Sequence, residues 1–384
     1  MSTLKVDGIR SNSATSDAIT LANDGTCTAN ITNNLSNRNL IINGAMQVAQ
    51  RGTSSTSSGY ATVDRFRYLH GTVDNSPTQA QVDVASGTTP YNLGFRKAYK
   101  LTNADQTSGA QAATVVRLQT KIEAQDIANS GWNYTSASSY ITFSFWIKSS
   151  IGQSFEGQIL TEDGTVYSYP FSTGTLTADQ WTKVTKTIPG NSNLQFDNNN
   201  GSGLNIQLMA FMGTTYSGTV TLNQWAAYNA SARVPDMTST WYTTNGSTLE
   251  VTGVQVEVSD YATSFEFRSY GDELARCQRY FQTGYVFTAN DPYFHGYYGG
   301  GAGWMRYFFP VTLRTSPAIS FNSYTQIQVY ESGSNGWQNR DLTYGTSQIT
   351  HLILFLNTPN HNYGKLLRLS GGSTYPIYYA SAEL

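Results

Sequence analysis

Apolar and polar residues alternate with a period of two in a series of short stretches between residues 80 and 259, which Gly, Asn, Ser and Thr separate. This alternation is typical of strands with one buried face. In the stretch 140–149 it places one set of side chains on the core side, namely Ile141, Phe143, Phe145 and Ile147. Many short strands with turn residues between them predict a β-sandwich.

The segment that precedes these strands, residues 40–52, reads LIINGAMQVAQRG. Its two apolar runs flank the turn dipeptide Asn43-Gly44, which predicts a β-hairpin. A further strand-like stretch, YATVDRFRYL, follows a short Ser/Thr/Gly loop. We therefore expect a jelly-roll β-sandwich over residues 40–268.

One stretch has a helical rather than a strand period. Leu274, Cys277, Gln278 and Phe281 lie at i, i+3, i+4 and i+7, after Ser269 or Asp272 as N-cap. This predicts a linking helix over residues 269–283. Strand-like stretches resume after it, so residues 284–384 are expected to form a second, C-terminal β-sandwich.

Residues 1–39 are polar and contain only isolated apolar residues, too few to bury a core. Short alternating stretches there would become stable if identical copies covered each other's apolar faces, which favours an oligomerisation and attachment arm. A disordered leader is the alternative. The apolar residues expected at contacts between copies are Leu4, Val6, Ile19, Leu21, Ile31 and Leu35.

Composition narrows the function classes. Aromatic residues make up 13% of the chain, and 23 Lys and Arg against 25 Asp and Glu give a formal net charge of −2. The high aromatic content favours a mainly β protein, and the slightly negative net charge argues against a nucleic-acid partner. No apolar run is long enough for membrane insertion. The two cysteines and four scattered histidines have no ligand spacing, so neither a metal nor a cofactor is expected.

Charged residues are rare, yet some stand inside apolar strand segments. These are expected to form structural ion pairs that tie the first segment to the last strand of the sandwich. The candidates are Arg51, Asp64, Arg65, Glu257, Glu266 and Arg268. Glu162 and Asp163 belong to a turn, and neither has an identifiable partner carboxylate for glycoside hydrolysis, so the chain is expected not to be an enzyme.

Exposed aromatic rings suggest another chemistry, because they stack on the apolar faces of sugars. One candidate is Trp146, on the polar side of its strand, with Trp181 and Trp225 as weaker candidates. The other is a cluster around the glycine run 299–301, namely Tyr293, Tyr297, Tyr298 and Trp304. Core or subunit-contact roles are the alternative for both.

Two motifs resemble the tail-fibre and receptor-binding proteins of tailed bacteriophages. The first, NLIINGAMQVAQRG followed by YATVDRF, matches at Asn39, Leu40, Asn43, Gly44, Met46, Val48, Gln50, Arg51, Gly52, Tyr60, Asp64, Arg65 and Phe66. The second, GVQVEVSDYATSFEFRSYGDELARCQRYFQ, matches at Gly253, Gln255, Glu257, Ala262, Thr263, Phe265, Glu266, Arg268, Glu273, Leu274, Cys277, Arg279 and Tyr280. The sandwich between them also resembles carbohydrate-binding modules.

This resemblance implies a virion protein that is made in the host cytoplasm and acts outside the cell. We expect a homotrimeric tail fibre that contacts other virion proteins through its N-terminal arm and adheres to a host-surface glycan, with residues 284–384 as the candidate receptor-binding tip. Several weak sites would act together through avidity. A capsid decoration or cement protein, or a head fibre, is one alternative, and a glycan-degrading tailspike is a second.

Overall fold

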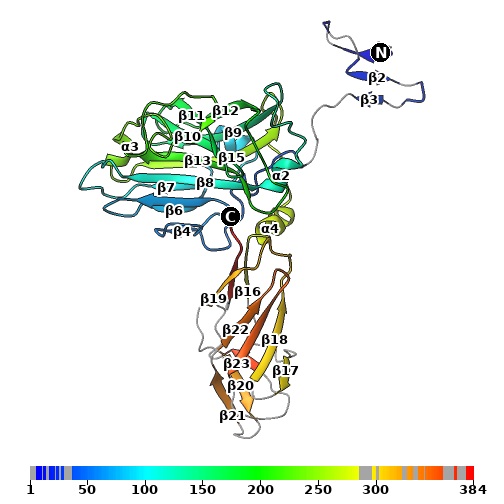
Figure 1. Cartoon of the computed structure of the whole chain (residues 1–384), viewed down its shortest axis with the longest axis vertical. Coiled ribbons are helices and arrows are strands. Elements are labelled where there is room, and N and C mark those ends of the chain that lie inside the picture. Colours follow the sequence, from blue (N-terminus) through cyan, green and yellow to red (C-terminus); the bar gives the residue numbers. More distant parts are fainter. Residues whose placement is uncertain are drawn as a thin grey trace.

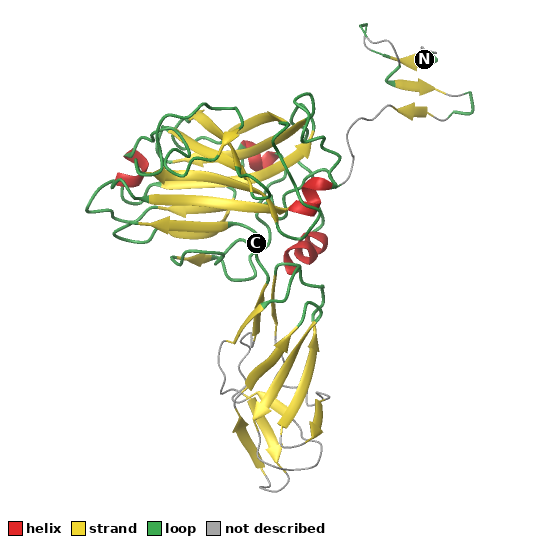
Figure 2. Cartoon of the chain, viewed as in Figure 1, coloured by secondary structure: helices red, strands yellow, loops and turns green. Residues whose placement is uncertain are grey.

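The computed structural model describes residues 6–10, 12–13, 17–21, 23–25, 27–29, 37–284, 296–299, 302–321, 327–331, 336–340, 342–357, 367–369 and 378–384. Antiparallel strands dominate, and the helices are short (Figure 2). The expected mainly β fold is confirmed. None of the helices in this described part has the length and apolar character that a membrane-spanning helix needs.

Two six-stranded sheets form the sandwich in the upper part of Figure 1. The β13 sheet contains, in spatial order, β14 (Ala226–Ala227), β11 (Tyr167–Thr175), β10 (Ser154–Thr161), β13 (Ser202–Met212), β8 (Val115–Glu123) and β5 (Arg67–Gly71). The β9 sheet contains β12 (Thr182–Pro189), β9 (Tyr140–Ser149), β15 (Thr248–Val258), β7 (Lys97–Thr102), β6 (Thr78–Asp83) and β4 (Ser54–Ser55).

The chain crosses repeatedly between these sheets, as in a jelly roll, and the strands within each sheet pair antiparallel. Three short helices lie in the connections, namely α1 (Thr89–Asn92), α2 (Ala124–Ala128) and α3 (Thr240–Thr243). Because each sheet gives one face to the shared core, each leaves a second face outside.

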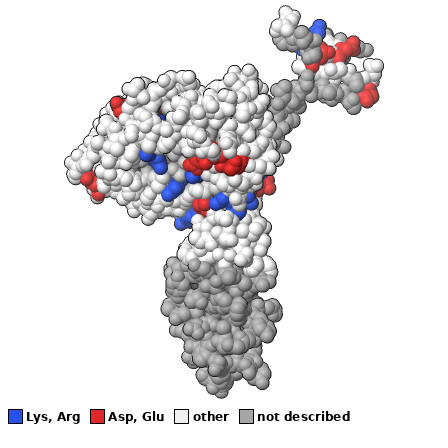
Figure 3. All heavy atoms as spheres, viewed as in Figure 1, with Lys and Arg blue, Asp and Glu red and all other residues white. Residues whose placement is uncertain are grey.

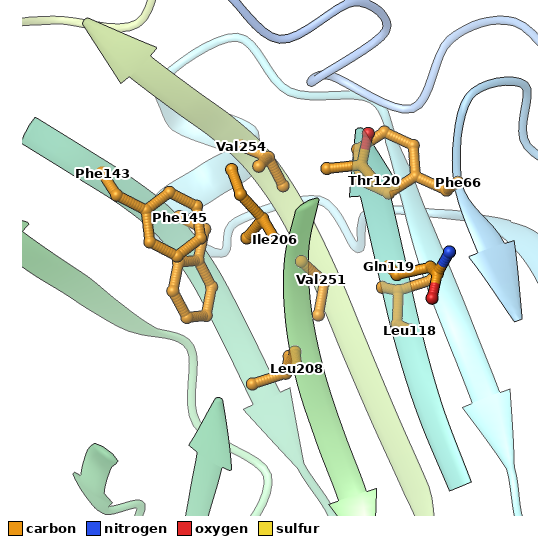
Figure 4. Close-up of a pocket in the computed structure, with 10 residues that line it drawn as sticks. All are labelled: Phe66, Leu118, Gln119, Thr120, Phe143, Phe145, Ile206, Leu208, Val251 and Val254. Atoms are coloured by element: carbon orange, nitrogen blue, oxygen red, sulfur yellow. The ribbon is translucent and has the colours of Figure 1, made fainter. Parts of the chain in front are cut away.

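The core between the sheets is aromatic and aliphatic. Phe143 and Phe145 of β9 face Ile206 and Leu208 of β13, as Figure 4 shows. Alternate side chains of residues 141–147 therefore face the core, as the sequence predicts. A cavity of about 20 Å³ remains there, which has room for roughly one water molecule and none for a sugar.

A second apolar cluster covers part of the outer face of the β9 sheet. Phe95 is buried at its centre, and its ring lies 4.9 Å from Phe265 and 5.1 Å from Phe267 between centroids. The half-buried Trp146 and Trp181 pack against the same cluster. This outer face is thus partly closed by the protein's own aromatic rings.

The prediction of a hairpin over residues 40–52 is wrong. This segment is a series of turns without strand pairing, and Asn43 and Met46 have positive φ angles of 61° and 59°. The buried Asn43 side chain replaces a ladder, because its amide donates to the carbonyls of Val48 (2.8 Å) and Asp64 (2.9 Å) and its oxygen accepts from the Val48 N–H. A side chain that bonds to the backbone can compete with strand pairing in this way.

The linking helix is shorter than expected. α4 spans Tyr270–Gln278, and Ser269 is its N-cap, with the hydroxyl accepting from the Asp272 N–H at 3.2 Å. Cys277 is buried on it and forms no disulfide. Phe281 does not belong to the helix, since it begins strand β16 and its buried ring faces the sandwich.

Described strands of the C-terminal region lie below the sandwich in Figure 1. We call the sheet that is next to the sandwich the neck sheet; it contains β16 (Phe281–Gly284), β25 (Tyr378–Ser381) and β19 (Ala318–Phe321). The other strands are β17 (Gly296–Gly299), β18 (Ala302–Phe308), β23 (His351–Asn357), β22 (Leu342–Ser347), β21 (Gly336–Arg340), β20 (Ile327–Glu331) and β24 (Leu367–Leu369).

The N-terminal arm contains a small antiparallel sheet of β1 (Gly8–Ile9), β2 (Ile19–Leu21) and β3 (Cys27–Ala29). Val6, Ile9 and Leu21 are 39%, 52% and 39% exposed, while Ile19 is half-buried. The expected contact residues Leu4, Ile31 and Leu35 lie outside the described residues. Apolar side chains that a single chain leaves at the surface are the kind that contacts between copies would bury.

We predict that removal of residues 1–36 leaves the sandwich folded but abolishes self-association. The cut spares Asn37, whose N–H donates to Glu266 at 2.5 Å. Sedimentation of the truncated and full chains at equal concentration measures the outcome. If both sediment as the same oligomer, the sandwich or the C-terminal region holds the copies together, and the arm does not.

Candidate functional site

The outer face of the β13 sheet is strongly polar. Cross-strand pairing places Gln119 of β8, Gln207 of β13 and Gln158 of β10 in one row, and Arg67 of β5 continues that row. Neighbouring rows add more polar side chains. We call these residues the polar face: Arg67, Arg117, Gln119, Lys121, Glu156, Gln158, Asn205 and Gln207.

Hydrogen bonds join part of the polar face into a network. The Gln158 amide donates to the Gln207 oxygen at 3.0 Å, and the Arg117 Nη1 donates to the same oxygen at 3.2 Å. Glu162, just after β10, accepts from Lys121 at 2.6 Å and from Asn205 at 2.7 Å. The network holds these side chains in place along the sheet.

Other buried atoms of this face have no hydrogen-bond partner within the described protein. They are Arg117 Nε, Gln119 Oε1, Asn205 Oδ1 and Glu156 Oε2. The last three belong to side chains that are only 2% to 6% exposed. Each such atom costs roughly 1 to 3 kcal/mol unless a hydroxyl or another polar group reaches it.

The two carboxylates beside this face are held differently. Burial raises the pKa of Glu156, which has Ser172 as a hydrogen-bond donor. Burial acts in the same direction on Glu162, but the hydrogen bonds from Lys121 and Asn205 outweigh it and lower its pKa. At neutral pH Glu162 is therefore a firmly ionised member of an ion pair.

The aromatic candidates are not gathered at one place. Trp146 packs against the Phe95 cluster on the β9 sheet, and Trp225 is buried, with its indole N–H donating to the Pro189 carbonyl at 2.7 Å. Tyr293 lies outside the described residues. Tyr297 of β17 is paired with Trp304 of β18, and Tyr298 with Gly303, but only their backbone is described. Their role in glycan binding stays a prediction.

Three of the expected charged residues lie where the first segment meets the last strand of the sandwich. Arg268 lies 3.2 Å from Glu266 and 3.6 Å from Glu273, and it donates to the carbonyls of Ile41 and Asn39. Glu266 accepts from the Asn39 N–H at 2.7 Å. Glu257 lies 3.8 Å from Arg38, which was not a candidate.

The other three gather around a residue that the sequence did not indicate, Glu383. Arg51 lies 3.1 Å from Glu383 and 3.8 Å from Asp64, and Arg65 donates to Glu383 as well. We call Arg51, Arg65 and Glu383 the neck clamp. Burial lowers the pKa of Arg65, but the charge of Glu383 acts against burial and the pKa is raised, so Arg65 stays charged although it is 1% exposed.

Aromatic rings complete the neck clamp. The Arg65 guanidinium lies 3.5 Å from the centroid of the Tyr280 ring, and that of Arg51 lies 3.5 Å from the centroid of the Phe281 ring. The Tyr280 hydroxyl donates to Glu123 at 2.6 Å. The neck clamp thus joins Arg51 and Arg65, which precede β5, to Tyr280 and Phe281 after α4 and to Glu383 near the C-terminus.

Metal-ligating side chains do not cluster. In the part of the chain that the structure describes, no three His, Cys, Asp or Glu residues lie close enough to hold a metal ion.

In Figure 3 the charged side chains of the sandwich gather mainly in its lower half, toward the neck, and most of the remaining visible surface is uncharged.

No protein-family model and no curated protein matches this chain. Among solved structures, the enzymatically active domain of tailspike protein 4 of bacteriophage CBA120 is 9% identical over 58% of this chain, with a TM-score of 0.32, and the match covers 22% of that domain's chain. A putative sugar binding protein from Bacteroides thetaiotaomicron is 11% identical over 58% of this chain and 100% of its own, with a TM-score of 0.30.

A family 11 carbohydrate-binding module from Clostridium thermocellum is 9% identical over 55% of this chain and 98% of its own, with a TM-score of 0.25. Likenesses at this level assign neither a family nor a function.

The neck clamp generates a stability prediction. Glu383→Gln leaves Arg65 buried without its counter-charge, and we expect it to lower the free energy of unfolding by about 3 to 5 kcal/mol. Thermal and denaturant unfolding measure the loss. Asp83→Asn is the control, because the Lys97–Asp83 pair is exposed and contributes less than about 1 kcal/mol. Equal small effects of both variants would show that the clamp does not stabilise the neck.

Asp64 generates a pH prediction. Burial raises its pKa to about 6 from an ordinary value of 3.8. The folded state therefore binds this proton more tightly than the unfolded chain, and the associated stability, on the order of 3 kcal/mol, is lost as the pH rises from about 4 through about 6. We expect the difference in unfolding free energy between Asp64→Asn and the wild type to shift in favour of the variant over this range. A difference that does not change between pH 4 and pH 7 would contradict the raised pKa.

Proposed function

We propose that this protein is a structural adhesin of a tailed-phage particle, whose sandwich binds a host-surface glycan on the polar face without cleaving it. The observation that carries the glycan part is the set of amide and charged side chains that strand pairing holds in adjacent rows of that face. Arg67, Arg117 and Lys121 are its partly exposed members. Sugar hydroxyls both donate and accept, so an oligosaccharide could pair with these partly exposed groups.

The position of the polar face also supports binding. Its side chains come from adjacent strands of a sheet, so their spacing is fixed by the ladder and not by a loop. A preorganised surface loses less entropy on binding than a mobile one. On the β9 sheet the Phe95 cluster occupies part of the outer face, and on the β13 sheet Met209, Met212 and Val234 cover another part of its outer face.

The spacing of the carboxylates argues against cleavage. Glu156 and Glu162 lie six residues apart along β10 and its end, which corresponds to roughly 20 Å of extended chain. Glycosidases hold their two carboxyl groups at roughly 5 to 9.5 Å. Glu162 is moreover occupied by Lys121 and Asn205. These observations argue only against Glu156 and Glu162 as a catalytic pair. Burial and then the charges of Asp197 and Glu162 raise the pKa of Asp163, so a tailspike depolymerase stays the second alternative.

The virion part of the proposal is supported by the two sequence motifs that resemble phage tail fibres, together with the exposed apolar residues of the arm. A homotrimer attached through that arm would present several weak sites at once and gain avidity. A capsid decoration protein or head fibre differs only in where the arm attaches. Imaging of particles with labelled protein separates these locations.

Gln119→Leu tests the glycan site. Because the Gln119 oxygen is buried and unpartnered, we expect this variant to be as stable as the wild type or more stable, while its affinity for host polysaccharide falls about 2- to 10-fold, the loss of one hydrogen bond. Binding to immobilised polysaccharide and thermal unfolding measure the two quantities. No new reducing ends should appear during incubation.

Gln79→Leu is the matched control. Gln79 is equally buried, but it lies between the sheets and bonds to Thr62 and Tyr99. It should lose stability and keep its affinity. If Gln119→Leu binds as tightly as the wild type, or if reducing ends accumulate and Glu162→Gln stops them, the polar face is not a non-catalytic glycan site.

A further inference from the structure

We infer that the glycan bound on the polar face is acidic, and that its anionic group is held by a cluster of three arginines, Arg67, Arg117 and Arg233, here called the arginine cluster. The inference rests on the proposed function and names its class of ligand. A carboxylate, sulfate or phosphate group on a sugar shares the required chemistry, since each presents oxygens that a guanidinium fork can bind.

Strand pairing brings the first two arginines together. Leu69 of β5 is opposite Arg117 of β8, and Arg67 is opposite Gln119. Arg67 and Arg117 are therefore diagonal neighbours on the same outer face, with Cα atoms about 7 to 8 Å apart. Long guanidinium side chains at that spacing can reach a common ligand.

The third arginine comes from the segment after β14. Tyr228 is bonded through its N–H to the Val166 carbonyl at one side of the sheet, and Val234 packs against Met209, which is opposite Arg117. The segment between them thus runs along the outer side of the sheet. The Arg233 guanidinium lies 4.4 Å from the centroid of Tyr216 and 6.0 Å from that of Tyr228.

None of these three arginines belongs to an ion pair among the residues that the structure describes. Arg117 donates from Nη1 to Gln207, and its buried Nε has no partner. Arg233 donates from Nε to the Ala230 carbonyl at 3.0 Å. Burial lowers the pKa of Arg117, and the positive charges of Arg233 and Arg67 act in the same direction.

The carboxylates in reach do not neutralise this cluster. Glu162 acts on Arg117 but is paired with Lys121 at 2.6 Å. Glu156 lies two strands away from Arg117, with Met209 between them. Three like charges without a counter-ion repel one another, and a bound anion would relieve that repulsion.

The test uses immobilised bacterial polysaccharides as probes, namely uronic-acid-containing, sulfated, phosphorylated and neutral ones. Each uronic-acid polymer is accompanied by its carboxyl-reduced form, which differs only in that charge. We expect the full-length protein to bind acidic polymers, and binding to a uronate polymer to fall at least 10-fold after carboxyl reduction. Preference for the sulfated or phosphorylated polymers would support the same cluster with a different anion.

Arg117→Gln and Arg233→Gln should each weaken binding to the acidic polymer by about 10- to 100-fold, the loss of a charge-assisted hydrogen bond. Arg233 is on a surface segment, so its variant stays informative if Arg117→Gln folds poorly. Arg96→Gln removes the same charge from an exposed residue before β7 of the other sheet and should bind like the wild type.

Two outcomes would overturn the inference. Equal binding before and after carboxyl reduction with no preference for other acidic polymers, or arginine variants that bind like Arg96→Gln, would show that the cluster does not hold an anion. Binding of neutral polymers that Gln119→Leu weakens would leave the proposed function intact and remove only the acidic specificity. Binding to no polysaccharide would contradict both.

Discussion

The pairing of Glu383 with Arg51 and Arg65 is the contact on which the arrangement of this molecule depends. It brings the penultimate residue of the chain against the segment that opens the sandwich, so residues more than 300 positions apart in sequence share one buried charge network. Further hydrogen bonds hold the same chain end. The Tyr60 hydroxyl donates to the Leu384 carbonyl, and Arg314 donates to the carbonyls of Ala382 and Glu383. The two desolvated arginines are tolerated here because each has both a counter-charge and an aromatic ring against its guanidinium.

The two outer faces of the sandwich differ in character, although the sheets are equally large. On the β9 sheet, Phe95 and Phe265 from loops pack with Trp146 of β9 as an extra apolar layer. On the β13 sheet, amides and guanidinium groups lie in rows, and several of their atoms find no protein partner. Folding alone does not require such a row, since leucines of similar size would be less costly.

Local pattern was enough to predict the strands and their core side, as residues 141–147 show, because one buried face dictates the alternation. It failed at residues 40–52, where the Asn43 amide bonds to distant carbonyls and holds turns in place of a hairpin. Glu383 could not be foreseen, since nothing local reveals a partner 318 residues from Arg65. The polar face is visible in the sequence only as the alternation of Arg117, Gln119 and Lys121 with the residues between them. The same alternation is found in any strand with a solvated face.

The return of the chain to the neck has a mechanical consequence. β16 leaves the sandwich and β25 comes back beside it, so that Phe281 is opposite Ser381 at the sandwich end of the pair. A domain joined by one peptide can swivel about that bond, whereas a second attachment point fixes its rotation. The neck sheet is therefore attached to the sandwich at two points, and a torque applied to it would be transmitted to the sandwich through both the covalent link and Glu383.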